Sequence, residues 1–215
     1  FEDIAFECDD MNVRADRERY VGVLCEDRRP VLDRLRVVVH QFVEREQREV
    51  VQAISSGPRG VVRGPFVALL HNPVLASRMQ SLGEYLRYQT GLPDPLVELV
   101  VLVTARHHTC QYEWYAHARL ARQAGLAPAI IDAIAADQTP AGMSEDEALV
   151  HAFATETLAH GQPSDERFEA ARARFGRERV LSLLALLGYY STLAYVLNTA
   201  HIPLPAGAAP PLPPR

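Results

Sequence analysis

Three residues with chemically useful side chains follow one another at helical spacing: Cys110, Glu113 and His117. They are three and four residues apart, so on a helix they lie within about 60° of one another. The neighbouring Trp114 and Tyr115 give the same segment enough apolar bulk to be packed inside the protein. The spacing therefore predicts a polar stripe on a largely buried helix.

The residue types in this stripe are those of a general acid/base. A glutamate four residues before a histidine can hydrogen-bond the imidazole and raise its basicity, so we expect Glu113 to orient His117 and His117 to move a proton. Near that histidine and near a helix N-terminus, we expect Cys110 to be a nucleophilic thiolate. Structural interpretations remain open, because Glu/His pairs at this spacing are common and a lone buried cysteine is usually a small hydrophobe.

Other kinds of site find little support in the sequence. The histidines near the stripe lack the His-x3-His spacing that presents two metal ligands on one helical face, so we predict no metal and no cofactor. Cys8, Cys25 and Cys110 are widely spaced and odd in number, and no Cys-x-x-Cys motif occurs. We expect them to be free thiols in a reducing compartment, without a dithiol redox couple.

Helical patterns surround the stripe on both sides. Apolar residues at helical period predict helices over residues 30–56, 65–70, 74–90, 96–105, 110–124, 128–137, 144–159, 164–175 and 178–198. A buried strand is the alternative for 96–105, but no second segment has the β-branched alternation needed to pair with it. Thr109 is the expected N-cap of the stripe's helix, and Ser144 with Glu147 predicts a capping box. The predicted fold class is all-α.

The chain divides into three stretches of different character. Residues 1–27, with five acids among the first ten, are predicted to be an N-terminal extension that is flexible, and residues 28–201 to be the helical domain. Residues 202–215 contain six prolines, which cannot continue a helix, so we expect an extended or disordered tail.

The composition and net charge of the chain limit the kinds of partner that it can bind. A chain of 215 residues with 48% hydrophobic content can bury a sizeable core, most simply as one domain. The net charge of −5 argues against nucleic acid or an anionic membrane as partner. We find no apolar run of the roughly 18 residues that span a bilayer and no basic segment followed by an apolar one at the start. We therefore expect a cytoplasmic protein with a small-molecule substrate.

Glu98 precedes the stripe by twelve residues. The segment from Glu98 to His117 resembles the signature of the carboxymuconolactone decarboxylase family in the alkylhydroperoxidase D superfamily. The resemblance extends over about residues 57–198. It takes in Arg63-Gly-Pro-Phe66, Leu82-Gly-Glu-Tyr-Leu-Arg87, Gly188-Tyr-Tyr190 and Asn198. It implies an alkylhydroperoxidase-D-like helical bundle that assembles into a homo-oligomer.

The peroxidase branch of that superfamily has a glutamate, then Cys-x-x-Cys, then a histidine four residues after the second cysteine. By resemblance, Glu98 matches the relay glutamate, Cys110 the first cysteine and His117 the histidine, whereas Glu113 takes the place of the second cysteine. A disulfide cannot form there. The resemblance therefore favours the decarboxylase-like branch, which often has Tyr-Glu-Trp followed by a histidine.

That branch implies cofactor-free chemistry on a small carboxylated or enolisable compound, with Glu113 and His117 handling the proton. We expect Arg63 or Arg106 to hold a substrate carboxylate by a bidentate contact, and Trp114 to line the substrate site.

Two other hypotheses stay open. One is a thiol-dependent peroxidase in which Cys110 works with an external thiol, or with Cys8 or Cys25 as resolving partner. The other is a non-catalytic helical module for binding or assembly that keeps the fold.

Overall fold

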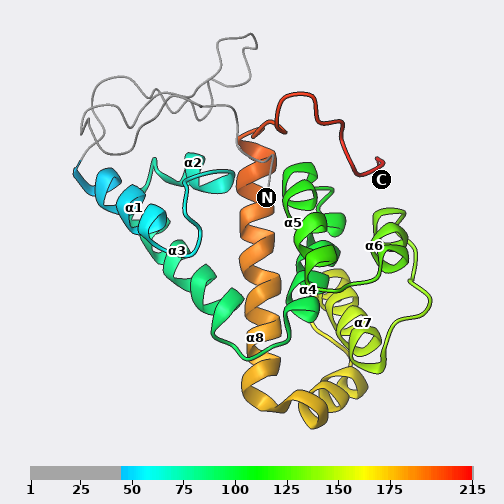
Figure 1. Ribbon diagram of the computed structural model, residues 1–215. Helices are drawn as coiled ribbons and strands as arrows, with labels where there is room; N and C mark the ends of the chain where they lie inside the picture. The colour runs from blue at the N-terminus through cyan, green and yellow to red at the C-terminus, as the bar shows by residue number, and fades with distance from the viewer. Residues whose placement is uncertain (1–44, 215) are drawn as a thin grey trace.

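The computed structural model describes residues 45–214, and within them the chain forms eight α-helices and no strand (Figure 1). The helices are α1 (Arg45–Ser56), α2 (Pro65–Leu69), α3 (Pro73–Tyr88), α4 (Asp94–His107), α5 (Gln111–Gln123), α6 (Pro128–Ala135), α7 (Glu145–His160) and α8 (Asp165–Thr199). The predicted all-α class is confirmed. Of the helix predicted over residues 30–56, only 45–56 is described; the predicted extension over 1–27, with Cys8 and Cys25, lies outside the described residues.

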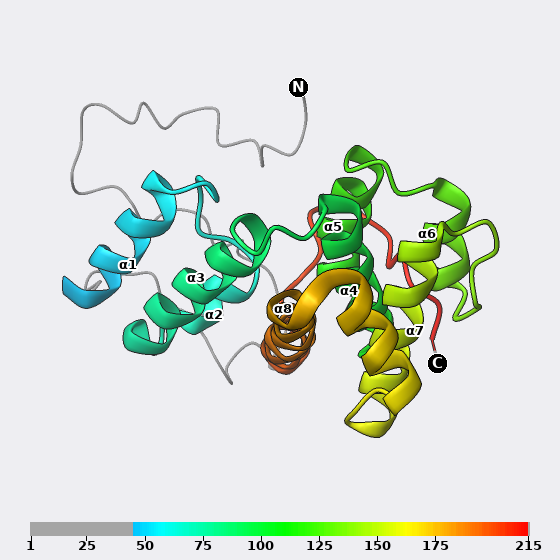
Figure 2. The ribbon, with the colours of Figure 1, turned by 90° about the horizontal axis from the view of Figure 1, so that it is seen from below.

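The long helix α8 runs through the middle of the fold, with α1 to α3 on one side and α4 to α7 on the other (Figures 1 and 2). On that second side α4 packs against α5, α7 and α8. Its residues Leu99 and Leu102 are fully buried, as are Leu183 and Leu186 of α8. The apolar run in α4 is thus a core helix surrounded by other helices, and the strand alternative is wrong.

Local signals explain most of the helix boundaries. Asn72 caps α3 by accepting a hydrogen bond from the Leu75 amide, and the predicted capping box of Ser144 and Glu147 begins α7. The prediction that Thr109 caps α5 is wrong, because Cys110 occupies the N-cap position.

Thr109 instead ends the preceding helix. It has a φ of 47°, and the amides of Thr109 and Cys110 donate to the carbonyls of Arg106 and Ala105. This pair of hydrogen bonds closes the C-terminus of α4 in a Schellman motif, which requires a left-handed residue at this position.

The two helices predicted over 164–175 and 178–198 are one element with a bend. Gly176, with φ 82° and ψ 164°, interrupts the helical backbone of α8 in a conformation that only glycine adopts at low cost. Contrary to our expectation, α8 is long and apolar enough to cross a membrane by length and composition, with a mean hydropathy of 1.8 over 18 residues. The apolar composition of α8 is explained by its central position, because it packs against α2, α3, α4, α5 and α7.

The predicted proline-rich tail has an irregular backbone and is anchored near its end. Gln111 exchanges two hydrogen bonds of 2.9 Å with the backbone of Leu212, whose side chain is only 3% exposed. Arg106 donates a hydrogen bond of 2.9 Å to the carbonyl of Pro213. The tail thus crosses from the end of α8 over the turn between α4 and α5 (Figure 1).

Candidate active site

The two antiparallel helices α4 and α5 bring together residues that are distant in sequence. Glu98 lies in the second turn of α4, and His117 lies in the middle of α5, which returns alongside it. Nδ1 of His117 and Oε2 of Glu98 are 2.7 Å apart, and both side chains are nearly buried. Sequence spacing predicted Glu113 as the hydrogen-bond partner of His117; Glu98 holds that position instead, because the neighbouring helix presents it directly to the imidazole.

The charge of Glu98 determines which ring nitrogen of His117 carries the proton in their hydrogen bond. Burial by itself would raise the pKa of Glu98, but His117 and Arg87 outweigh that effect and hold the pKa below its ordinary value. Arg87, from α3, places Nη2 3.4 Å from Oε1 of Glu98. An ionised carboxylate can only accept, so Nδ1 of His117 carries the proton of the shared hydrogen bond. The other ring nitrogen is then the one that can exchange a proton with a substrate.

Glu113 lies one helical turn before His117 and is 2% exposed. Burial raises its pKa well above the ordinary value, which favours the protonated form of its carboxyl group. Its Oε2 atom has no hydrogen-bond partner among the described residues. The arrangement therefore places a buried carboxyl group of raised pKa and a hydrogen-bonded imidazole on one helix face.

Cys110 is fully buried and packs with Ala194, Leu197 and Ile202. Burial, reinforced by the nearby Glu113, raises the pKa of its thiol to about 12, although backbone amides at the start of α5 oppose this shift. The predicted thiolate is therefore wrong, since loss of hydration outweighs the helix N-terminus here.

We expect Cys110 to react slowly with a thiol reagent in the native protein. In a Cys8→Ser/Cys25→Ser background, Ellman's reagent at pH 7.5 should label Cys110 at least about tenfold more slowly in the folded than in the denatured protein, because the thiol is buried and protonated. Equal rates in the two states would contradict the description of this thiol.

The structure joins none of the predicted substrate-binding residues to Glu98 or His117. Arg63 is exposed beside Tyr112, and Arg106 is 4% exposed and donates to Pro213. Trp114 is 4% exposed within the main core. Their roles toward a substrate stay predictions.

Residues from α8 and from the turn after α1 complete the surroundings of His117, and the sequence analysis gave them no role. The ring of Tyr190, in α8, meets His117 edge to face at 5.2 Å, and Tyr189 meets Tyr190 in the same way. Arg59 donates a hydrogen bond of 3.1 Å to the Tyr189 hydroxyl. Arg87, Tyr189 and Tyr190 lie in segments on which the family resemblance rests, so the resemblance was the signal that could have identified them.

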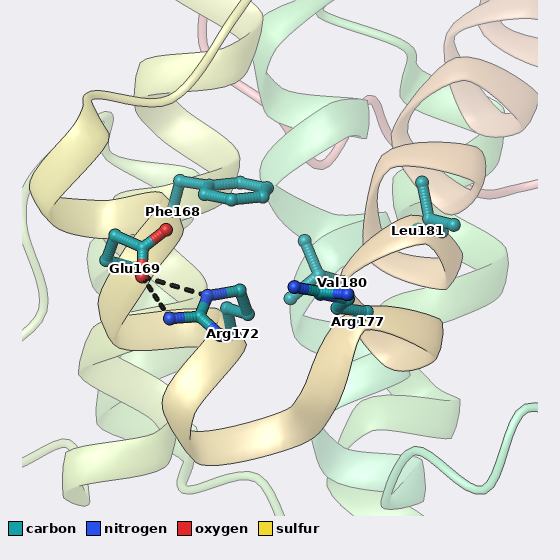
Figure 3. A pocket seen from close by; sticks show the side chains of 6 residues that line it. All are labelled: Phe168, Glu169, Arg172, Arg177, Val180 and Leu181. Carbon is teal, nitrogen blue, oxygen red and sulfur yellow. Dashed lines mark hydrogen bonds and ion pairs between the residues drawn. The ribbon is translucent and has the colours of Figure 1, made fainter.

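Metal-binding groups and cavities are two further kinds of feature that could form a site. Within residues 45–214, no group of three or more His, Cys, Asp or Glu side chains is placed to hold a metal ion. A cavity of about 530 Å³ lies at the bend of α8, and neither Glu98 nor His117 lines it. It is lined by Phe168, Glu169, Arg172, Arg177, Val180 and Leu181 (Figure 3).

The amino-acid sequence around these residues is similar to that of a known protein family. Residues 73–156, less than half of the chain, match the model of the carboxymuconolactone decarboxylase family, and that range contains Arg87, Glu98, Cys110, Glu113 and His117. No curated protein matches the chain. This match supports the resemblance to the carboxymuconolactone decarboxylase family over residues 73–156, and the fold of that family is all-α and alkylhydroperoxidase-D-like.

Proposed function

We propose that this protein performs cofactor-free acid/base chemistry, a decarboxylation or a proton transfer, on a small carboxylated or enolisable compound. The observation that carries the proposal is the 2.7 Å contact between His117 and an ionised Glu98, one helical turn from Glu113, whose pKa is raised by burial. Such a set can both remove and deliver a proton near neutral pH, which is the requirement of general acid/base catalysis.

Each residue has a distinct task in this mechanism. Glu98 orients the imidazole by accepting the hydrogen bond of Nδ1, while Arg87 helps to keep Glu98 ionised. In a decarboxylation the carbon–carboxylate bond breaks, carbon dioxide leaves, and the electron pair stays on the substrate as an enolate. His117 or Glu113 then delivers a proton to carbon and regains one from water. In an enolisation His117 takes the proton from carbon first.

The surroundings favour the loss of carbon dioxide. Tyr190 and Glu113 are each 2% exposed, so charge at this site is poorly hydrated. An ionised carboxylate loses hydration when it enters such a site, whereas neutral carbon dioxide has little to lose.

A peroxidase function has less support. The thiol of Cys110 is neutral near pH 7, and the place of a second motif cysteine is taken by Glu113. A non-catalytic module for binding or assembly needs no proton transfer and would turn over no substrate. Assays of turnover therefore distinguish it from the acid/base enzyme and from the peroxidase.

A screen of small acids tests the proposal. β-Keto acids, 2-oxo acids and lactone carboxylates that raise the melting temperature are incubated with the protein in D₂O, and carbon dioxide loss or deuterium incorporation at carbon is followed by NMR. We expect turnover that is lost in His117→Gln. Dithiol-dependent hydroperoxide reduction, lost on Cys110→Ser, would instead support the peroxidase, and stabilisation without any turnover would support the binding module.

We further propose that the protein is a homo-oligomer. In support, the single chain exposes large apolar side chains along α3, with Val74 64%, Tyr88 51% and Leu82 43% exposed. We expect light scattering after gel filtration to give a mass above 23.9 kDa that falls in Leu82→Glu. The exposed control Gln123→Glu should leave the mass unchanged, and a monomeric parent protein would contradict the proposal.

A further inference from the structure

Buried polar atoms that lack a hydrogen-bond partner gather at one place in the described part of the chain. They are Nε of Arg59, Oε1 of Gln80, Nε of Arg87 and Oε2 of Glu113; a fifth such atom, Nε of Arg106, lies elsewhere. Buried polar groups in proteins are nearly always hydrogen-bonded, so the two arginine Nε donors in this region call for an acceptor.

The hydroxyl of Tyr189 lies at the centre of this region. Arg59 donates to it, and Arg87 and Glu113 are both close enough to influence its pKa, which burial raises. Gly83 of α3 faces the same hydroxyl so closely that a Cβ atom there would collide with it and with Arg59. Gln80 lies one turn before Gly83 on the same helix, and Arg87 lies one turn after it.

The unused donors have the geometry that recognises a carboxylate. Arginine binds a carboxylate in bidentate fashion through Nε and one terminal amino group. The bonds that Arg59 and Arg87 make, to Tyr189 and to Glu98, both use Nη2, which has a second N–H group, and Nε of each arginine is unpaired among the described residues. The Tyr189 hydroxyl can add a third donor.

We propose that Arg59 and Arg87, together with the Tyr189 hydroxyl, form the subsite that binds the carboxylate of a small organic acid. As a substrate site this rests on the proposed function, but carboxylate binding can be measured without any turnover. The subsite adjoins the proton-transferring residues, because Arg87 contacts Glu98 and Glu98 contacts His117. It replaces Arg63 and Arg106 as the expected carboxylate partners: Arg106 already binds Pro213, and Arg63 is exposed.

Titration of carboxylate probes by calorimetry tests the subsite. Malonate and succinate are the probes, and malonamide is the uncharged control. We expect the dicarboxylates to bind the full-length protein and malonamide not to. Arg59→Gln and Arg87→Gln should each raise the Kd at least about tenfold, because each variant loses a charge-assisted hydrogen bond to the probe. The matched controls Arg63→Gln and Arg78→Gln, both exposed arginines, should change it less than about twofold.

The variant Arg87→Lys separates an effect on binding from an effect on folding. Arg87→Lys keeps the charge but loses the fork, so we expect the Kd to rise while circular dichroism stays that of the parent. The proposal is overturned if neither dicarboxylate binds at millimolar concentration, if the Kd is unchanged in both glutamine variants, or if Arg63→Gln weakens binding equally. His117→Gln should still bind the probes, so probe binding without turnover of any acid would reject the acid/base function and leave the subsite standing.

Discussion

Replacing His117 with glutamine should lower turnover of a substrate found by the screen at least about 100-fold, the lower end for loss of a general acid/base. Glutamine can still donate a hydrogen bond to Glu98, which lies 2.7 Å from the imidazole, but it cannot take up or release a proton near neutral pH. Circular dichroism and the melting temperature should stay close to those of the parent protein. Initial rates at saturating substrate give the measurement.

His160→Gln serves as the matched control, because His160 is exposed at the end of α7. It should leave the rate unchanged. A rate for His117→Gln within a few-fold of the parent rate would mean that another group moves the proton.

Replacing Glu113 with glutamine should make the protein's stability depend less on pH. Burial raises the pKa of Glu113 in the folded state, so the unfolded chain loses this proton at lower pH than the folded protein does. The native protein therefore loses stability as pH rises from about 4.5 toward the folded-state pKa, and below that range Glu113 contributes nothing. Glutamine removes this loss, and each pKa unit corresponds to about 1.4 kcal/mol.

Urea unfolding at pH 4 and pH 7.5 measures the effect. Relative to the parent, Glu113→Gln should gain at least about 1 kcal/mol more unfolding free energy at pH 7.5 than at pH 4. The cost of fitting the amide is the same at both pH values and cancels in this comparison. Glu166→Gln, at an exposed position of α8, should show no such difference. A Glu113→Gln effect equal at both pH values would show that Glu113 is ionised in the folded protein.

The helices were predictable because their signals are local. Periodicity located α3 to α7 to within a few residues, and the Ser144–Glu147 capping box was visible in four consecutive positions. The stripe of Glu113 and His117 was predictable for the same reason, since helical phase depends only on spacing. The bend at Gly176 was also visible, as a break between two helical patterns.

What the sequence analysis missed depends on contacts between distant segments. The partner of His117 is Glu98, nineteen residues earlier, because α4 and α5 pack in antiparallel fashion. The high pKa of Cys110 follows from its burial against Ala194 and Leu197 of α8, more than eighty residues later. No local pattern contains either contact. The resemblance pointed to Glu98, whereas helical spacing alone pointed to Glu113.

The rates of His117→Gln, Glu113→Gln and Cys110→Ala, compared in one assay with one substrate, test the acid/base relay most directly. We predict that His117→Gln is the most damaging, that Glu113→Gln also slows turnover, and that Cys110→Ala costs much less, because the mechanism needs no covalent intermediate at sulfur. If Cys110→Ala is the most damaging of the three and His117→Gln the least, the acid/base relay is wrong and the buried thiol carries the chemistry.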